Sequence, residues 1–265
     1  MRFTYIFLLS ILIFSCSPFQ KALKSENVEV KYKEANRLFE AKKYAKSLRL
    51  FEQLAPVYKG KPQAEVMFYQ YSQALYNEKE YYAAGYQFDK FVSSYPKSAK
   101  AEEAAYIAAI CSTKLSPIYS LDQVDTDKAL DKLQSFADTY PESAYLPEIN
   151  STVKMLREKL EVKAYEIAKQ YNTISDYKAA LVALDLFIAD YPGTPFKEKA
   201  LYYRLDSAYK LAINSVPAKM EERLKISKVA YANLIKFKAD TAFKEKADNM
   251  LAKIDKDLQQ FSKIN

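Results

Sequence analysis

The sequence predicts an all-α protein, an α-solenoid of about five helix pairs with a C-terminal capping helix. Only three glycines occur in 265 residues, which is too few for the turns of an all-β fold. A short apolar segment also recurs along the chain, and repeats of a few tens of residues are typical of stacked helix pairs that share one core. With 49% hydrophobic and 28% charged residues, the composition is ordinary for a folded protein.

The recurring segment is predicted to form a corner between two helices. It occurs at residues 91–98 (FVSSYPKS), 136–143 (FADTYPES) and 187–194 (FIADYPGT). In each copy an apolar helix reaches its last turn, a proline stops it, and a serine or threonine follows where it can cap the next helix. We therefore expect three equivalent corners.

An apolar stripe precedes each corner. Its residues are spaced by three and four positions, which places them on one face of a helix, and a small residue in the middle allows a neighbouring helix to approach closely. Weaker copies at residues 44–58 and 224–238 bring the number of repeats to five. The three strong stripes are Tyr81, Ala84, Phe88, Phe91 and Tyr95; Thr126, Ala129, Leu133, Phe136 and Tyr140; and Tyr177, Ala180, Leu184, Phe187 and Tyr191.

The first three repeats are predicted over about residues 28–60, 61–97 and 98–142. Each contains two stretches with apolar residues at helical spacing. In the third repeat, residues 116–125, which include Pro117, separate the two helices. A surface loop is the simpler interpretation of this insertion, and a contact with a partner is the alternative.

The last two repeats are predicted over about residues 143–193 and 194–239. The fourth has a long first helix, from about residue 146 to 174. A final amphipathic helix, 240–263, has the half-polar pattern that seals the end of a solenoid. A docking helix for another subunit is the alternative for this segment.

The N-terminus predicts a lipoprotein signal peptide over residues 1–15. Arg2 precedes an almost wholly apolar run that is too short to span a membrane and that resembles a bacterial lipobox where it ends at Cys16. We expect Cys16 to carry the lipid and to begin the mature chain, with residues 16–27 as an extended tether. Phe14 departs from the small or branched residue usual in a lipobox. The alternative interpretation, an ordinary signal peptide that is cut elsewhere, therefore stays open.

Composition argues against catalysis. The chain has no histidine, the commonest general base and metal ligand. The second cysteine, Cys111, lies in an apolar helix with no histidine to activate it. We expect no enzyme activity, metal or cofactor.

The net charge of +7 suits an acidic protein partner or anionic lipid headgroups. Nucleic acid is not an expected partner, because the chain contains no dense basic tract and is predicted to be exported. A solvated surface is the plainer reading of the excess lysines.

Three tyrosines on the predicted first helices, Tyr32, Tyr69 and Tyr106, recur at intervals of 37 residues. They are predicted to stack as a ladder along one side of the first three repeats. They can simply pack between helices with their hydroxyls at the edge. Alternatively, together with Asn36, Gln73 and Tyr76, they line a groove that binds an extended, aromatic peptide.

The stripe with its small and aromatic positions resembles the second helix of the tetratricopeptide repeat. Together with the corner motif Phe-x3-Tyr-Pro-x-Ser/Thr, the lipobox and the five repeats, it resembles the BamD (YfiO) family of the β-barrel assembly machinery. The resemblance implies an outer-membrane lipoprotein that carries palmitate on Cys16 and faces the periplasm. It also implies that the C-terminal repeats bind a BamA-like β-barrel subunit and that the N-terminal repeats bind unfolded outer-membrane proteins.

Two other classes stay open at this point. One is a different periplasmic tetratricopeptide module, similar to CpoB, that acts in cell division or peptidoglycan coordination. The other is an enzyme or glycan binder on a helical scaffold, such as the lytic transglycosylases or the SusD-like lipoproteins. The repeats leave no room for a separate catalytic domain, and the chain has no tryptophan for glycan binding of the SusD type.

Overall fold

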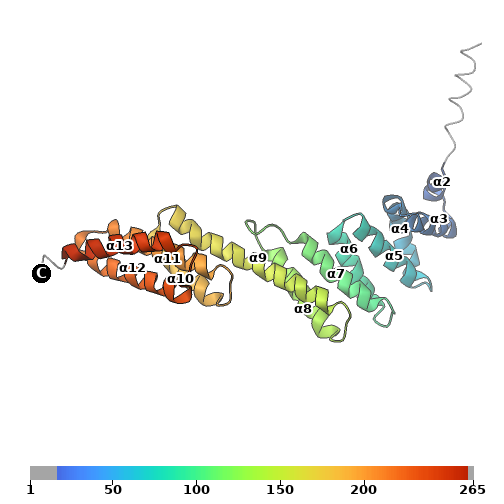
Figure 1. Cartoon of the computed structure of the whole chain (residues 1–265). Helices are drawn as coiled ribbons and strands as arrows, with labels where there is room; N and C mark the ends of the chain where they lie inside the picture. Colours follow the sequence, from blue (N-terminus) through green and yellow to red (C-terminus); the bar gives the residue numbers. More distant parts are fainter. Residues whose placement is uncertain (1–16, 262–265) are drawn as a thin grey trace, which may run out of the picture. The chain divides into compact units, whose positions relative to one another are not determined.

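The computed structural model describes residues 17–261, which form twelve α-helices and, within that range, no strand (Figure 1). The helices are α2 (Pro18–Lys24), α3 (Val28–Glu40), α4 (Tyr44–Tyr58), α5 (Ala64–Asn77), α6 (Tyr81–Ser94), α7 (Ala101–Leu115), α8 (Val124–Thr139), α9 (Leu146–Thr173), α10 (Tyr177–Asp190), α11 (Lys197–Ile213), α12 (Pro217–Phe237) and α13 (Lys244–Phe261). Helix α9 matches the long helix predicted over about residues 146–174, and α13 lies within the predicted final helix 240–263 but begins four residues later.

The described chain divides into two compact units. Unit 1 holds the residues up to Pro117 together with Leu121–Lys154, and therefore contains α2 to α8 and the start of α9. Unit 2 holds Ile118–Ser120 and the residues from Met155 onward, which include α10 to α13. Within each unit, helices that follow one another in sequence pack side by side. This arrangement of consecutive helix pairs confirms the predicted all-α, tetratricopeptide-like fold.

The apolar stripes form the core of both units. The small central residues Ala84, Ala129 and Ala180 are completely buried, as are the large residues one turn later, such as Phe88 and Leu133. Burying a side chain of that size contributes about 1.5–3 kcal/mol. The stripes therefore supply most of the driving force for pairing the helices.

Three of the tight turns between the helices of a pair share one geometry. Lys42, Lys79 and Ser175 adopt positive φ values of 55°, 64° and 66°. At the first turn, the N–H of Lys43 donates to Leu38 O at 2.8 Å and that of Lys42 donates to Phe39 O at 2.9 Å. This pair of bonds is the Schellman motif that ends a helix, here with a lysine or serine where glycine is commonest.

The corners between repeats bring a hydroxyl and a glutamate together. The hydroxyl of Ser143 accepts the N–H of Tyr145 at 3.1 Å and donates to Glu102 of α7 at 2.6 Å. We call this arrangement the corner clasp. The equivalent pairs Ser98–Glu65 and Thr241–Glu198 are also joined at 2.6 Å.

The corner clasp differs in detail from the expected helix cap. The hydroxyl binds the N–H two residues later, within the turn that precedes the helix, instead of an N–H of the helix itself. Its second bond reaches back to the preceding repeat. The serine or threonine therefore connects repeats as well as shaping the turn.

The extended tether expected over residues 16–27 is not observed in its described part, residues 17–27. Pro18–Lys24 forms helix α2, whose N-cap is Ser17. Phe19 is 6% exposed and Ala22 is 1% exposed, because α2 packs on α3 and α4. Proline at the first position of a helix is favourable, so Pro18 starts a helix here instead of preventing one.

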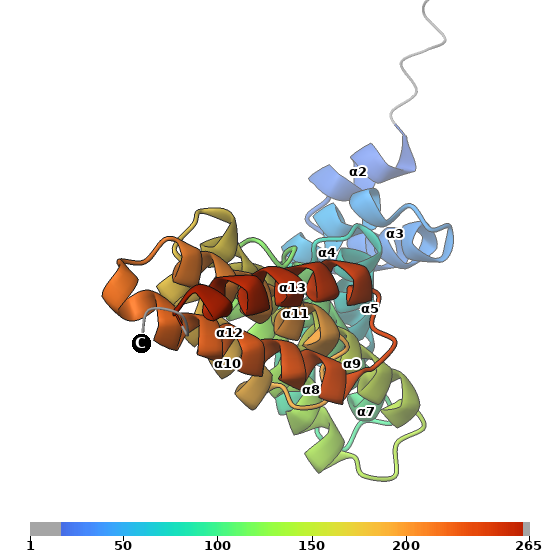
Figure 2. The same ribbon diagram turned by 60° about the vertical axis from the view of Figure 1, so that its left-hand side comes forward.

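Helix α13 covers the end of unit 2, where it packs against α11 and α12 (Figure 2). Its Ala247 and Ile254 are completely buried, while its lysines point to solvent. Among residues 17–261, no helix is both long enough and apolar enough to cross a membrane.

Gly85 of α6 lies where α6 and α7 approach most closely. A Cβ atom at this position would be 3.2 Å from the Cβ of Cys111. Cys111 itself is completely buried, and burial raises the pKa of its thiol to about 12. The thiol is therefore part of the core of unit 1.

Candidate peptide-binding surface

Tyr69 of α5 is built into the core of unit 1. Its ring is 9% exposed and lies 6.0 Å from the ring of Phe88 and 5.4 Å from that of Phe91, between ring centroids. The Lys100 ammonium lies 5.6 Å from the centre of the ring. Burial, and secondly the nearby Glu103 carboxylate, raise the pKa of Tyr69 well above its usual range. This tyrosine is mainly a packing residue.

Tyr106 of α7 is half-buried and forms an aromatic pair at the edge of unit 1. Its ring stacks on Tyr145 with a centroid distance of 4.1 Å and an interplanar angle of 9°. Burial, and secondly the carboxylate of Glu148 on α9, raise the pKa of Tyr106. The pair presents two aromatic rings next to an acidic group.

Gln73 and Tyr76 continue this surface along α5. The side-chain amide of Gln73 donates to the hydroxyl of Tyr69 at 3.0 Å. Tyr76 packs edge-on against Tyr81 at 5.7 Å, and its hydroxyl is close enough to Tyr106 to affect the pKa of that group. The structure thus brings Tyr69, Gln73, Tyr76 and Tyr106 together. We call these four residues, with Tyr145, the tyrosine surface.

Tyr32 and Asn36 of α3 have different neighbours. Tyr32 stacks on Tyr58 at 5.1 Å, and no ring contact joins it to Tyr69 within residues 17–261. The side-chain oxygen of Asn36 is buried and has no hydrogen-bond partner in the described part of the chain. A buried acceptor of this kind normally has a partner, but the oxygen is covered, so the structure does not place Asn36 with the tyrosines of α5 and α7.

The sequence prediction missed Tyr145, the stacking partner of Tyr106. A signal for it existed in the spacing. Tyr145 lies five residues after the corner residue Tyr140, and Phe196 and Phe243 lie five residues after the equivalent positions 191 and 238. These residues stack on Tyr165 and Tyr202 of the first helices at 5.1 Å and 4.2 Å. After the corner at Tyr95 the equivalent position holds a lysine, which covers Tyr69 instead.

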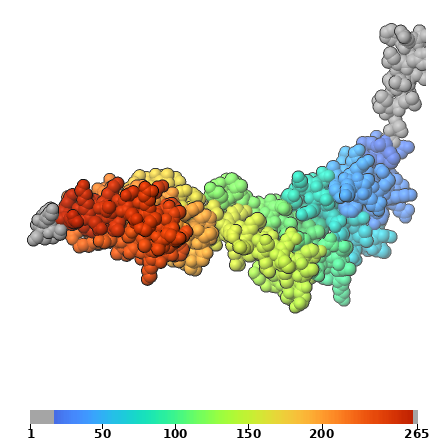
Figure 3. Space-filling model, viewed as in Figure 1, coloured from blue at the N-terminus to red at the C-terminus, as the bar shows by residue number. Residues whose placement is uncertain are grey.

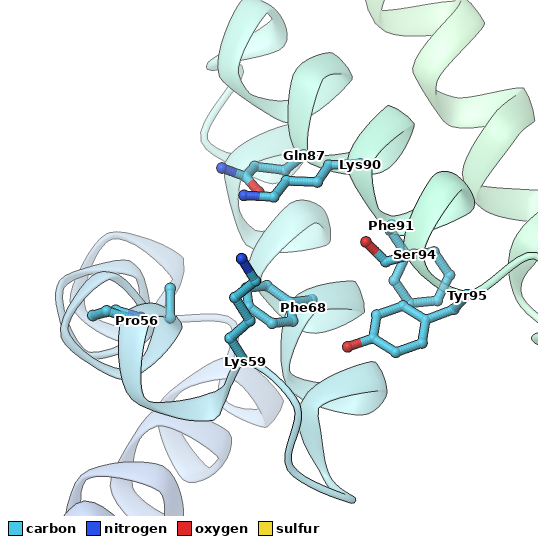
Figure 4. A pocket seen from close by; sticks show the side chains of 9 residues that line it. Pro56, Lys59, Phe68, Gln87, Lys90, Phe91, Ser94 and Tyr95 are labelled. Atoms are coloured by element: carbon cyan, nitrogen blue, oxygen red, sulfur yellow. The ribbon is translucent and has the colours of Figure 1, made fainter.

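A hollow of about 220 Å³ lies on another side of unit 1, between α4, α5 and α6 (Figure 4). Phe68 and Phe91 form its apolar part, and the side chains of Lys59 and Lys90 lie above it. Neither ammonium is in an ion pair with another residue of 17–261. The hollow therefore suits an apolar group that carries a negative charge. Its lining is Ala55, Pro56, Lys59, Phe68, Gln87, Lys90, Phe91, Ser94 and Tyr95.

The proposed lipidation site, Cys16, lies outside the described residues, as does the signal peptide. Cys111 is the one free cysteine that the structure describes, and it is completely buried in α7. No group of three or more acidic or cysteine side chains in residues 17–261 could hold a metal ion.

These features define a helical-repeat protein, in which stacked helix pairs carry an aromatic surface. The model of the YfiO family, described as outer membrane lipoprotein, matches residues 24–224. The chain belongs to this family of outer-membrane lipoproteins.

A curated relative is the outer membrane protein assembly factor BamD of Caulobacter vibrioides. It is 29% identical over 136 residues, which are 51% of this chain and 44% of the relative. The match therefore spans less than half of the relative's length. Among solved structures, the TPR2AB domain of yeast Sti1 in its pHSP90 complex is 14% identical, with a TM-score of 0.40, over 86% of this chain and 98% of that one.

Proposed function

We propose that this protein is a non-catalytic scaffold of the β-barrel assembly machinery, anchored in the outer membrane through a lipid on Cys16 and facing the periplasm. In this proposal, unit 1 binds unfolded outer-membrane proteins, and the C-terminal repeats bind a BamA-like β-barrel subunit. The family match over residues 24–224 is the observation that carries the proposal. The assembly function in the name of the relative agrees with it.

The tyrosine surface supports unit 1 as the client-binding part. Tyrosine offers a large contact area at a small cost in conformational entropy. The half-buried rings of Tyr76, Tyr106 and Tyr145, with the Gln73 amide between them, can stack on aromatic side chains and hydrogen-bond to an extended backbone. Tyr69 supports this surface from below.

Exposed apolar side chains support unit 2 as the docking part. Val182 and Leu186 are one turn apart on α10 and are 62% and 58% exposed. Val229 of α12 is 58% exposed. Val182 and Leu186 thus give α10 an exposed apolar strip, and exposed apolar patches often mark an interface with another protein.

The client-binding proposal is tested with the double variant Tyr76→Ala/Tyr106→Ala. A synthetic peptide that copies the last, aromatic-rich strand of an outer-membrane barrel serves as the probe. We expect at least about a tenfold loss of affinity, because buried aromatic contacts carry most of the binding energy of an interface. Affinity is measured by fluorescence anisotropy, and circular dichroism verifies the fold.

The matched control is Tyr82→Ala/Tyr86→Ala, which removes two exposed tyrosines of α6 that lie outside the tyrosine surface. Equal affinities of both folded variants and the wild type would reject the tyrosine surface as the binding site.

A pull-down from gently solubilised membranes tests the assembly itself. Recovery of a β-barrel subunit with periplasmic domains supports the assembly-machinery proposal. Recovery of division or peptidoglycan proteins would instead indicate a periplasmic module that acts in cell division or peptidoglycan coordination.

A further inference from the structure

Six basic residues gather on helix α2, on the turn before α4 and on the first half of α4, near the start of the described chain. All six side chains are exposed. In Figure 3 this part of unit 1 forms the blue surface that includes α2. We call it the α2/α4 basic surface; it consists of Lys21, Lys24, Lys42, Lys43, Lys46 and Arg49.

Packing of Phe19 joins the cations of the two helices into one surface. The Lys46 ammonium and the Arg49 guanidinium each lie 5.7 Å from the centre of the Phe19 ring. Phe19 is nearly buried, so α2 is held on the first repeat. Helix α2, with its lysines, therefore lies against Lys46 and Arg49 of α4 in the folded protein.

None of the six cations is in an ion pair with another residue of 17–261. Two acidic side chains of the first two repeats have other partners. Glu34 binds Arg37 at 2.7 Å and feels Lys43 only as a weaker, more distant charge, and Glu78 accepts the N–H of Ala45 at 3.0 Å. The positive charge of the surface is therefore available to an external partner.

We propose that the α2/α4 basic surface contacts the anionic phospholipid headgroups of the leaflet that holds the lipid on Cys16. The inference rests on the lipid anchor of the proposed function. Cys111 is buried in the core, which leaves Cys16 as the cysteine that can carry lipid. Cys16 is bonded to Ser17, the cap of α2, so little free chain separates the anchor from this surface.

The short connection favours a membrane over an acidic protein as the partner. Charges attract a surface mainly within a Debye length, about 8 Å at physiological ionic strength. The lipid on Cys16 would hold α2 within a few residues of the headgroups. Each lysine or arginine near an anionic membrane strengthens binding by about fivefold, so the surface would set which side of unit 1 faces the bilayer.

Vesicle flotation of the chain from Ser17 onward, which contains every described residue but no lipid anchor, tests the proposal. We expect binding to vesicles of phosphatidylcholine with phosphatidylglycerol, weakened by salt, and no binding to phosphatidylcholine alone. Replacing Lys21, Lys24 and Lys46 by glutamine should weaken binding by on the order of a hundredfold. The charge-matched control replaces the exposed Lys246, Lys253 and Lys256 of α13 by glutamine and should bind like the unchanged chain.

Equal losses in both triple variants would show that only net charge matters and would overturn the proposal. Absence of binding to anionic vesicles would also overturn it and would favour an acidic protein as the partner. The anchor is tested separately, by palmitate labelling of the full-length protein and of Cys16→Ala in cells. Because the flotation experiment uses protein without lipid, failure of the anchor and failure of the basic surface give different results.

Discussion

The hydroxyl of Thr241 makes two hydrogen bonds at the last corner of unit 2. It accepts the N–H of Phe243 at 3.3 Å and donates to Glu198 at 2.6 Å. Glu198 also accepts the N–H of Ala242 and pairs with Lys238 at 2.9 Å. These bonds, the one from Thr241 first among them, lower the pKa of Glu198 to about 2. The Glu198 side chain of α11 thus ties the first helix of the last pair to the corner that follows α12.

We predict that Thr241→Val destabilises the protein by about 1–2 kcal/mol, because it removes a donor from a carboxylate without changing the shape of the side chain. Urea unfolding followed by circular dichroism measures this change. Thr173→Val, at an exposed position of unit 2, is the control and should have an effect of less than about 0.5 kcal/mol. A Thr241 variant as stable as the control would show that the corner clasp contributes nothing.

The sequence predicted Ser98 and Ser143 at their corners, but it predicted neither Thr241 nor the glutamate of any clasp. The partner lies 33 to 43 residues earlier in the three observed clasps, so no local pattern connects the two. A weaker signal was present, since Glu65, Glu102 and Glu198 each stand four positions before a first-helix tyrosine.

The burial of Tyr69 was also only partly predictable. Its spacing identified the face of the helix, but only the packing of Phe88 and Phe91 shows that its ring lies inside.

Helix α2 is the element that the sequence did not predict. Seven residues are too few to show a helical period, and the polar residues and Pro18 looked like a linker. The helix is stabilised by a tertiary contact, the packing of Phe19 against α4. Isolated helices of this length are not stable in water, so α2 depends on that contact.

We predict that Phe19→Ala releases α2 while leaving the other helices folded. Removing a buried phenylalanine costs about 3 kcal/mol, which should speed amide exchange in residues 19–24 by about a hundredfold. Hydrogen-exchange mass spectrometry measures the rate for each peptide. Val30→Ala, at a position that is 46% exposed on α3, should leave it unchanged. Unaltered exchange in the Phe19 variant would mean that other contacts hold α2.

The complete chain lacks histidine, which shapes the response of the whole molecule to pH. The carboxylates of Glu34, Glu103, Glu198 and Asp248 have lowered pKa values, chiefly because of hydrogen bonds from neighbouring side chains. Their contribution to stability is complete above the usual carboxyl range and is lost as the pH falls. Burial raises the pKa values of Cys111, Tyr69, Tyr106 and Tyr165. Their contribution is complete below the usual thiol and phenol range and is lost as the pH rises.

We therefore predict that the midpoint of thermal unfolding is constant between roughly pH 6 and 8, where histidine is the side chain that ordinarily titrates. It should fall below about pH 4.5 and above about pH 9. Differential scanning calorimetry in buffers of equal ionic strength measures this profile. A step near pH 6.5 would contradict the prediction.

The fold at the scale of the molecule was predictable because each helix pair carries its own periodic stripe, as Ala84 and Phe88 show for α6. The boundary between the two compact units was not predictable. It falls at Lys154 and Met155, inside the continuous helical pattern of α9. Local spacing indicates that a helix exists, whereas the division depends on which distant residues pack on each half of it.

The corner clasp also limits how such a chain can lengthen or shorten during evolution. The repeat at residues 98–142 takes part at both of its ends, because Ser98 donates backward to Glu65 and Glu102 accepts forward from Ser143. Duplicating or deleting that whole repeat leaves every clasped glutamate with a hydroxyl donor, whereas a cut between Ser98 and Glu102 leaves a glutamate without its donor. Thr241, within residues 240–243, supplies the last hydroxyl of this kind. A gene shortened before this point would leave Glu198 without its donor.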